Sequence, residues 1–239
     1  MKRLLVTQAA QGAVTLSGDG FHHLVRVLRA QVGDLLEVFD GQGHTYSARL
    51  VSMGENEATL ELGEAKAHAA ARPVWVVQGL PKADKWEWVL QKGTELGAAV
   101  FWPALTAHTI VQPKDGPKKH ERWQRIVDEA ARQCGRADTA HVREPADFTR
   151  VLAELPPSAT LVFFDEAEGG ASLSAQAWPQ SSAPLVLLLG PEGGWSSAER
   201  EAVMNAGAVR VSLGRRVLRT ETAAIVALSL VQFQLGELS

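Results

Sequence analysis

The fold is decided by the stretch LVLLLGPEGGWSSAEREAVMNAGAVRVSLGRRVLRTETAAIVAL, residues 185–228. It contains two successive segments of the same construction. An apolar strand at 185–189 leads into the loop GPEGG and a helix, and a second strand at 209–213 leads into the loop GRRVLRTET and another helix. Ligands of open α/β sheets lie at the carboxyl ends of the strands. Two such ends, both rich in glycine and polar groups, predict one ligand site built from both loops.

Both helices carry terminal signals. The sequence SSAE at 196–199 has the form of a capping box, so the first helix is expected to begin at the second serine. Gly207 suits the position just after the end of that helix. Either Thr220 or Thr222 can cap the second helix. From Ala223 to Leu235 this helix is apolar nearly all round, which predicts that it is buried.

Two well-known phosphate-binding patterns are absent from these loops. A dinucleotide fingerprint needs G-x-G-x-x-G, and a P-loop needs G-x-x-x-x-G-K-[ST]. Trp195 stands where the second glycine of a P-loop would be. Glycine turns after strands also occur for structural reasons alone. Spacing by itself therefore leaves a ligand site and plain structural turns both open.

The chain divides near residue 70 into two predicted domains, 1–70 and 71–239. Short strand-like runs and one helix, Phe21–Arg29, predict a small β-barrel before the division. Strands that alternate with helices predict a parallel α/β sheet after it. The strands are expected at 3–6, 13–16, 35–39, 45–51 and 58–62, and then at 74–78, 98–102, 161–164, 185–189 and 209–213. The segment at 64–72 has no strand signal and is expected to be a linker or a short helix.

Composition excludes several classes of protein. The 239 residues, 46% of them hydrophobic, suit one large domain or two modest ones. A single cysteine excludes an intramolecular disulfide, which fits a reducing cytoplasm. No apolar run is long enough for a membrane span or a signal peptide, so we expect a cytoplasmic protein. A net charge of −3 disfavours general nucleic-acid binding, so any RNA contact must be local.

The pair GPEGGWS at 190–196 and LGRRVLRTETA at 213–223 resembles the SPOUT methyltransferases, which bind S-adenosylmethionine in a C-terminal trefoil knot. Among them it is similar to the RsmE-type family, which methylates N3 of a uridine in small-subunit (16S) ribosomal RNA. Gly93 and Trp195 stand where alanine and phenylalanine are usual in that family. Three further blocks are also similar: FHHLVRVLRAQVGD at 21–34, LPKADKWEWVLQKGTELG at 80–97 and RWQRIVDEAARQCGR at 122–136.

The resemblance implies a SPOUT-like parallel sheet with the knot at its C-terminal end, preceded by a PUA-like RNA-binding barrel. It also implies a homodimer, S-adenosylmethionine as the cofactor, and small-subunit ribosomal RNA or the assembled subunit as the substrate. No metal is expected. The residues matched to cofactor binding are Leu189, Gly190, Pro191, Glu192, Gly193, Gly194, Leu213, Gly214, Leu218, Arg219, Thr220, Thr222 and Ala223.

Arg219 and Glu221 are the catalytic candidates. Methylation at uracil N3 requires loss of a proton, which leaves negative charge on N3 and the flanking carbonyl oxygens. A guanidinium is a permanent cation with a rigid fork of donors, so Arg219 could hold a carbonyl and stabilise this charge. Glu221 is the nearest candidate to orient Arg219 and a weaker candidate for the base. A purely structural pairing of Arg219 with Glu192 or Glu221 stays open.

Basic side chains are the candidates for RNA contacts. The first predicted helix presents three of them opposite its buried stripe, and the helix that ends near Gly135 presents two more. Merely solvated faces would show the same spacing. Cys134 lies on the apolar stripe of the second of these helices and is expected to be packed. The residues assigned to RNA are His22, Arg26, Arg29, Lys82, Lys92, Arg132, Arg136 and Arg215.

Two alternative functions stay open. The same fold could methylate a ribose 2′-oxygen, which the identity of the product nucleoside would reveal. A non-catalytic RNA-binding or ribosome-assembly protein could also have kept the fold. Binding of S-adenosylhomocysteine would distinguish an enzyme from such a protein.

Overall fold

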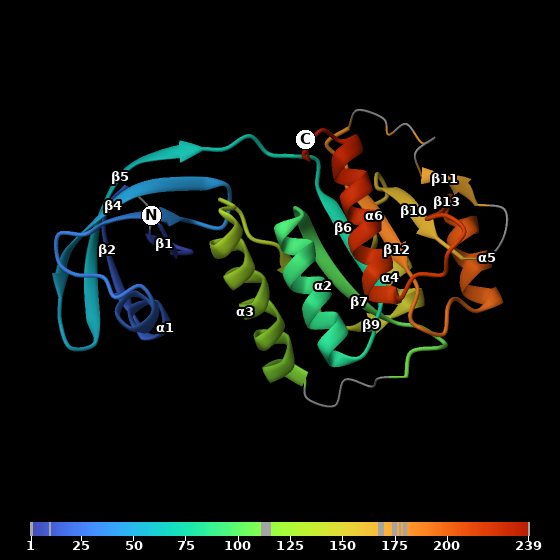
Figure 1. Cartoon of the computed structure of the whole chain (residues 1–239), viewed down its shortest axis with the longest axis horizontal. Coiled ribbons are helices and arrows are strands. Elements are labelled where there is room, and N and C mark those ends of the chain that lie inside the picture. Colours follow the sequence, from blue (N-terminus) through green and yellow to red (C-terminus); the bar gives the residue numbers. More distant parts are fainter. Residues whose placement is uncertain are drawn as a thin grey trace. The chain divides into compact units, whose positions relative to one another are not determined.

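The computed structural model of this chain describes residues 2–9, 11–110, 116–166, 170–173, 176, 178 and 181–238. The chain folds as two compact units (Figure 1). Unit 1 comprises Met1–Ala70 with Ala131–Thr139, and unit 2 comprises Ala71–Ala130 with Ala140–Ser239. The sequence did not indicate that residues 131–139 would fold with the first unit. Within the ranges given above, no helix is both long and apolar enough to cross a membrane.

Unit 1 is a five-stranded sheet with one short helical segment. Its strands are β1 (Lys2–Leu5), β2 (Gly12–Ser17), β3 (Leu35–Phe39), β4 (His44–Met53) and β5 (Glu57–Ala67). They lie in the order β1-β3-β4-β5-β2, with β1 and β3 parallel and the other neighbours antiparallel. The sheet and the helical segment share one apolar core, in which Leu24, Val38 and Leu50 are fully buried.

The helix predicted at Phe21–Arg29 is replaced by two shorter elements, α1 (Gly18–His22) and the π-helical turn η1 (His23–Val27). Arg29 lies beyond both and has a left-handed φ of 47°, which no helix can continue. The three basic side chains predicted on the outer face of this segment are exposed, as expected.

Strand β5 is longer than predicted. The segment 64–72 was expected to be a linker or a short helix, but residues 64–67 continue β5. Ala65 lies opposite Tyr46 and Ala67 lies opposite His44 in the antiparallel pair with β4. Residues 64–67 are all exposed, so pairing with the backbone of β4 holds them rather than burial.

Unit 2 is built on a parallel sheet. Its strands are β6 (Val74–Gly79), β7 (Ala98–Leu105), β8 (His141–Val142), β9 (Ala146–Asp147), β10 (Thr160–Phe164), β11 (Ala171–Ser172), β12 (Leu185–Leu189) and β13 (Val209–Ser212). Their order is β11-β13-β10-β12-β6-β7-β8, with β9 paired to β7 and every described pair parallel. The predicted parallel α/β sheet is confirmed, and the trefoil knot stays a prediction.

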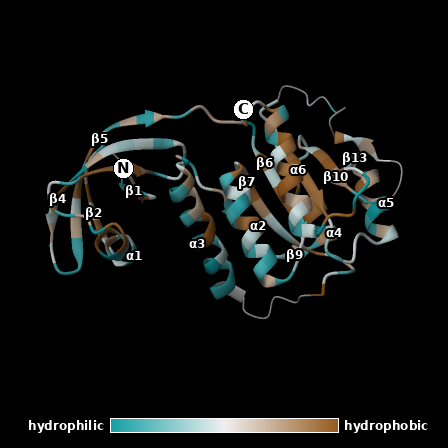
Figure 2. Ribbon diagram, in the orientation of Figure 1, coloured by the Kyte–Doolittle hydropathy of each residue, from teal (hydrophilic) through white to brown (hydrophobic). Residues whose placement is uncertain are grey.

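Helices cover both faces of this sheet. They are α2 (Ala83–Glu95), α3 (Gly116–Cys134), α4 (Phe148–Glu154), α5 (Ser197–Asn205) and α6 (Thr220–Gln234). Alternate strand residues point to opposite faces, so Leu185 and Leu187 share a core with α2, α3 and α6, whereas Val186 and Leu188 share one with α4 and α5. Strand β12 is therefore buried along its whole length. In Figure 2 the brown, hydrophobic residues of this unit concentrate in the strands and α6.

Helix α6 is apolar on most of its surface but is buried on one face only. Ala227 and Val231 lie in the core, whereas Leu230 is 44% exposed and Phe233 is 65% exposed. The prediction that this helix is buried therefore holds for one of its faces in the single chain and not for the other. The sheet and α2 cover one side of α6 and leave an apolar face uncovered.

Gly93 lets helix α2 approach the sheet closely. A Cβ at this position would lie 2.7 Å from Cε1 of Phe101 on β7. The ring of Phe101 also meets Trp86 edge-on, and Trp86 meets Trp123 of α3 in the same way. The glycine that lowers the helix propensity of α2 is thus required by its packing.

Candidate cofactor and RNA site

A cavity of about 380 Å³ lies at the carboxyl ends of β10, β12 and β13 in unit 2. Both glycine-rich loops contribute to its wall, so the single site expected from the two strand ends is present. The residues predicted for a cofactor that line it are Leu189, Gly190, Pro191, Glu192, Gly194, Leu213, Gly214, Leu218, Arg219, Thr220 and Ala223. Gly193 and Thr222 do not line it.

Gly193 serves the packing of its own loop. A Cβ at this position would lie 2.8 Å from Cβ of His108, in the loop that follows β7. The ring of His108 donates from Nδ1 to the carbonyl oxygen of Gly194 at 3.1 Å. The N–H of Ala107 donates to a carboxylate oxygen of Glu199 at 2.8 Å. The β7 loop therefore supports the first glycine loop from outside the cavity.

The end of the first glycine loop follows the sequence prediction. Gly194 has a φ of 69°, and its N–H closes a turn onto the carbonyl of Pro191 at 3.0 Å. Ser196 then caps α5 in a complete capping box with Glu199. Gly207 follows α5 with a φ of 80°, as its predicted position after the helix requires.

Thr220 joins three parts of the site. Helix α6 begins at Thr220 with Arg219 at the N-cap, and no side chain caps it, so the predicted threonine cap is absent. The hydroxyl of Thr220 instead donates to the carbonyl oxygen of Gly190 at 2.7 Å and accepts from the fully buried Gln78. Gln78 belongs to β6, so this network ties a central strand, the first glycine loop and α6 together.

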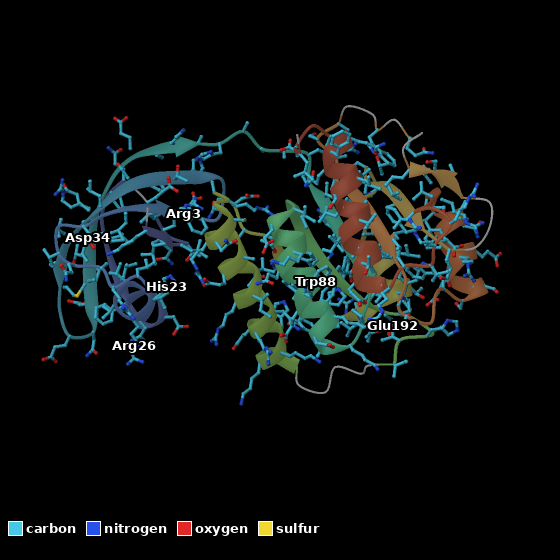
Figure 3. All side chains as sticks on the ribbon, in the orientation of Figure 1. Arg3, His23, Arg26, Asp34, Trp88 and Glu192 are labelled. Atoms are coloured by element: carbon cyan, nitrogen blue, oxygen red, sulfur yellow. The ribbon has the colours of Figure 1, made fainter. Side chains whose placement is uncertain are left out.

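Glu192 is anchored to the first turn of α2 (Figure 3). Its carboxylate accepts from Nζ of Lys85 at 3.1 Å. Burial opposes its ionisation, but hydrogen bonds from its own N–H, from Lys85 and from the N–H of Lys82 outweigh burial and hold the pKa of Glu192 below its usual value. The hydrogen bond to Glu192 also raises the pKa of Lys85. Both groups are therefore charged at neutral pH.

Glu221 lies against Lys85 and not against Arg219. Its carboxylate is 3.4 Å from Nζ of Lys85, and Glu221 is not among the residues that line the cavity. Arg219 lines the cavity and is exposed. Among the residues placed by the structure, Arg219 has no ion-pair partner. The structural pairing of Arg219 with Glu192 or Glu221, which the sequence left open, is therefore absent among the described residues, and the guanidinium is available to a ligand.

The sequence analysis missed the wall that β10 supplies. Phe164 ends this strand, Asp165 and Glu166 follow it, and all three line the cavity. The carboxylate of Asp165 is almost fully buried and pairs with Arg200 and Arg210, each at 3.0 Å. The strand itself was predicted, and its acidic end was the signal that could have identified these residues, because the ends of neighbouring parallel strands share one edge.

The residues assigned to RNA differ in their availability. In unit 1, His22, Arg26 and Arg29 are exposed. Lys92 pairs with the neighbouring Glu95 at 2.8 Å. Lys82 is exposed at the N-cap of α2, and Arg215 is exposed at the cavity.

Arg132 and Arg136 belong to the segment that folds with unit 1, not to the larger domain in which we expected them. Arg136 pairs with Asp138 at 2.7 Å, and its side chain is only 14% exposed. It therefore supports the fold rather than offering a free cation. Cys134, which was expected to be packed, is exposed because α3 ends at that residue.

Family models match both parts of the chain. Residues 68–232 match an RNA methyltransferase domain, and residues 16–63 match the PUA domain of RNA methyltransferases. The fold and the cavity described above are thus those of an RNA methyltransferase.

Named relatives narrow this class. The ribosomal RNA small subunit methyltransferase E of Bacillus subtilis is 35% identical, covering 96% of this chain and 94% of its own length. The protein of that name from Synechocystis is 36% identical over 95% of this chain and 76% of its own. A crystal structure of the Neisseria gonorrhoeae protein bound to S-adenosylmethionine is 28% identical, covers 98% and 97% of the two chains, and superposes with a TM-score of 0.87. This chain belongs to the ribosomal RNA small subunit methyltransferase E family.

Proposed function

We propose that this chain transfers a methyl group from S-adenosylmethionine to N3 of a uridine in small-subunit (16S) ribosomal RNA. The observation that carries the proposal is the cavity walled by both glycine loops and bordered by the exposed Arg219. Family membership and the neisserial relative bound to this cofactor support it.

The residues of the cavity fit the cofactor. A volume of about 380 Å³ lies within the range of small-molecule sites, and such sites combine apolar walls with a few polar groups. Leu189, Leu213 and Leu218 supply apolar surface, while Gly190 and Gly214 expose backbone groups. Among the described residues, no atom beyond Gly214 and its two chain neighbours lies within 4 Å of the position that a Cβ of Gly214 would take, so this space can admit a ligand.

The chain's own residues supply orientation and charge. When bound, S-adenosylmethionine provides a methyl group activated by its sulfonium. N3 lies on the Watson–Crick edge of uracil, so the base must be unpaired or flipped to reach the cavity. Arg219 holds a uracil carbonyl and stabilises the negative charge that grows as N3 loses its proton. The network of Gln78, Thr220 and Gly190 keeps the two loops in register around the reacting atoms.

Exposed cations of unit 1 are proposed to dock the RNA through its phosphates. Replacing Arg26 or Arg29 with alanine should weaken RNA binding and lower its salt slope by about one unit per lost contact. The affinity for S-adenosylhomocysteine should not change. Arg150→Ala is the matched control, because Arg150 is also exposed but lies on α4 of unit 2. If both unit 1 variants bind RNA with wild-type affinity, this surface does not dock the RNA.

A second copy of the chain is the proposed cover of the apolar face of α6. Leu230 and Phe233 are large and exposed, which is unfavourable for an isolated chain. Phe233→Glu should convert a dimer into a monomer by light scattering at micromolar concentration. A wild-type protein that is monomeric and fully active would contradict the homodimer.

The decisive experiment is methyl transfer to assembled small subunits and to free ribosomal RNA, with digestion and identification of the product nucleoside. N3-methyluridine is expected. A 2′-O-methylated nucleoside would favour ribose methylation instead. Absence of both products, together with no binding of S-adenosylhomocysteine by calorimetry, would favour a non-catalytic RNA-binding protein. We also propose that the reaction takes place in the cytoplasm.

A further inference from the structure

One tryptophan stands apart from the rest. Of the seven in the chain, all of which the structure describes, Trp88 alone is exposed, with 43% of its surface accessible to solvent. Trp86, two residues earlier on α2, is fully buried. Exposing an indole forfeits a large hydrophobic gain, so its cover is best sought in a partner.

Trp88 projects from the outer face of α2 (Figure 3). The buried residues of this helix are Trp86, Val89, Leu90, Gly93 and Thr94. At 100° per residue these positions centre on one side of the helix, and Trp88 falls nearly opposite that centre. Trp88 therefore lies on the face of α2 that points away from the sheet, and part of its indole is left to solvent.

Trp88 lies at the end of α2 that borders the cavity. Lys85, one turn earlier, lines the cavity and pairs with Glu221 at the start of α6. Further along, Gly93 faces Leu228, so α2 and α6 run side by side in the same direction. By this register the exposed Leu230 of α6 lies about seven residues beyond the level of Trp88, or roughly 10 Å along the axis. The indole is therefore separate from the apolar face of α6 and adjacent to the site.

The neighbours of Trp88 favour a nucleobase over a protein surface. On the surface of α2, Asp84 and Gln91 are exposed, and Lys85 and Lys92 are part-exposed. The indole is thus a single flat ring among polar groups, whereas protein interfaces need a contiguous apolar core. An isolated aromatic ring is instead the usual platform for an unpaired base, because every base has a π-face.

We propose that Trp88 stacks against a nucleobase of the RNA strand next to the target uridine and so holds the unpaired strand at the cavity. This inference rests on the proposed function. Trp88 acts in substrate binding, so its loss raises KM for the RNA rather than changing the affinity for the cofactor.

The test compares Trp88→Ala, Trp88→Phe and Trp88→Leu in methyl transfer to small subunits. Met204→Ala is the matched control, because Met204 is 46% exposed but lies on α5, on the other face of the sheet. Trp88→Ala should raise KM for the subunit roughly five- to hundredfold, the scale for one lost stack. Trp88→Phe should recover most of the loss and Trp88→Leu should not. The kcat value and the affinity for S-adenosylhomocysteine should stay at the wild-type level.

Three results would overturn the stacking role. The first is an unchanged KM in Trp88→Ala, and the second is an equal recovery of KM by Trp88→Leu and Trp88→Phe. The third is a changed oligomeric state of Trp88→Ala by light scattering, which would mean that the indole contacts a second copy of the chain. If wild-type protein transfers no methyl group, the proposed function fails by itself. Filter binding of wild type and Trp88→Ala to free ribosomal RNA then still decides the stacking role.

Discussion

Gly79→Ala probes the position of the first glycine loop without touching the cavity. Gly79 ends β6, is not among the lining residues, and has an ordinary backbone conformation. An added Cβ would lie 2.5 Å from Cδ and 2.6 Å from N of Pro191, and 3.1 Å from the carbonyl carbon of Gly190. Carbon atoms in good contact are about 3.5–4.0 Å apart, so the loop must retreat by roughly 1 Å. The effect of the substitution is therefore purely steric.

A displacement of this size has a predictable cost. Misplacing reacting groups by about 1 Å slows catalysis on the order of 10²-fold. We expect the affinity for S-adenosylhomocysteine to fall at least about tenfold, which corresponds to about 1.4 kcal/mol. Overpacking that the loop cannot relieve lowers the free energy of unfolding by about 1–3 kcal/mol.

Calorimetry with S-adenosylhomocysteine and thermal unfolding measure both effects. Gly20→Ala is the control, because the nearest side-chain contact of a Cβ there among the described residues is an ordinary one with Leu16, at 3.8 Å. A folded Gly79→Ala protein with wild-type affinity and wild-type turnover would refute the reasoning. The loop would then not be the wall that shapes the cofactor site.

Three other substitutions test separate parts of the structure. Arg219→Lys keeps the positive charge but loses the fork of donors, so single-turnover methyl transfer should slow by roughly 10²-fold while the cofactor affinity is unchanged. A rate near that of the wild type would mean that Arg219 has only a structural role. Thr220→Val removes the hydroxyl that hydrogen-bonds to Gly190 and Gln78, so the free energy of unfolding measured in urea should fall by about 1–3 kcal/mol, and Thr220→Ser should restore it. Equal stability of the wild type and both variants would argue against the network. Burial opposes ionisation of Asp40, but the N–H groups of Gln42 and His44 and the side chain of His44, at the start of β4, outweigh burial and hold the pKa of Asp40 below the usual 3.8. Its stabilising effect is therefore present above pH 3.8 and is lost as pH falls through the lower folded-state pKa. The difference in unfolding free energy between wild type and Asp40→Asn should shrink below pH 3.8, and a difference that is constant with pH would contradict this assignment.

The sequence by itself predicted the features that depend on local pattern. The sequence predicts strand β12 at Leu185–Leu189, and the structure shows the same bounds. A short, unbroken apolar run bounded by proline and glycine is typical of a buried strand. The capping box at Ser196 and the turn at Gly207 are likewise read from residues a few positions apart. That the two loops after β12 and β13 meet at one edge of the sheet followed from the rule that parallel strands share a carboxyl edge. Motif resemblance supplied the cofactor and the reaction, which spacing had left open.

The tertiary structure decided what depends on residues far apart in the chain. Gly193 fits against His108, and Glu192 is held by Lys85, more than a hundred positions away. Neither pairing leaves a periodic trace in the sequence. The sequence likewise carries no local signal that residues 131–139 fold with unit 1. Hydrophobic periodicity also could not show that α6 would be covered on one side only. Hydrophobic periodicity and turn preferences depend on residues a few positions apart. The anchoring of a loop and the burial of a helix face depend instead on contacts between segments that are far apart in the sequence.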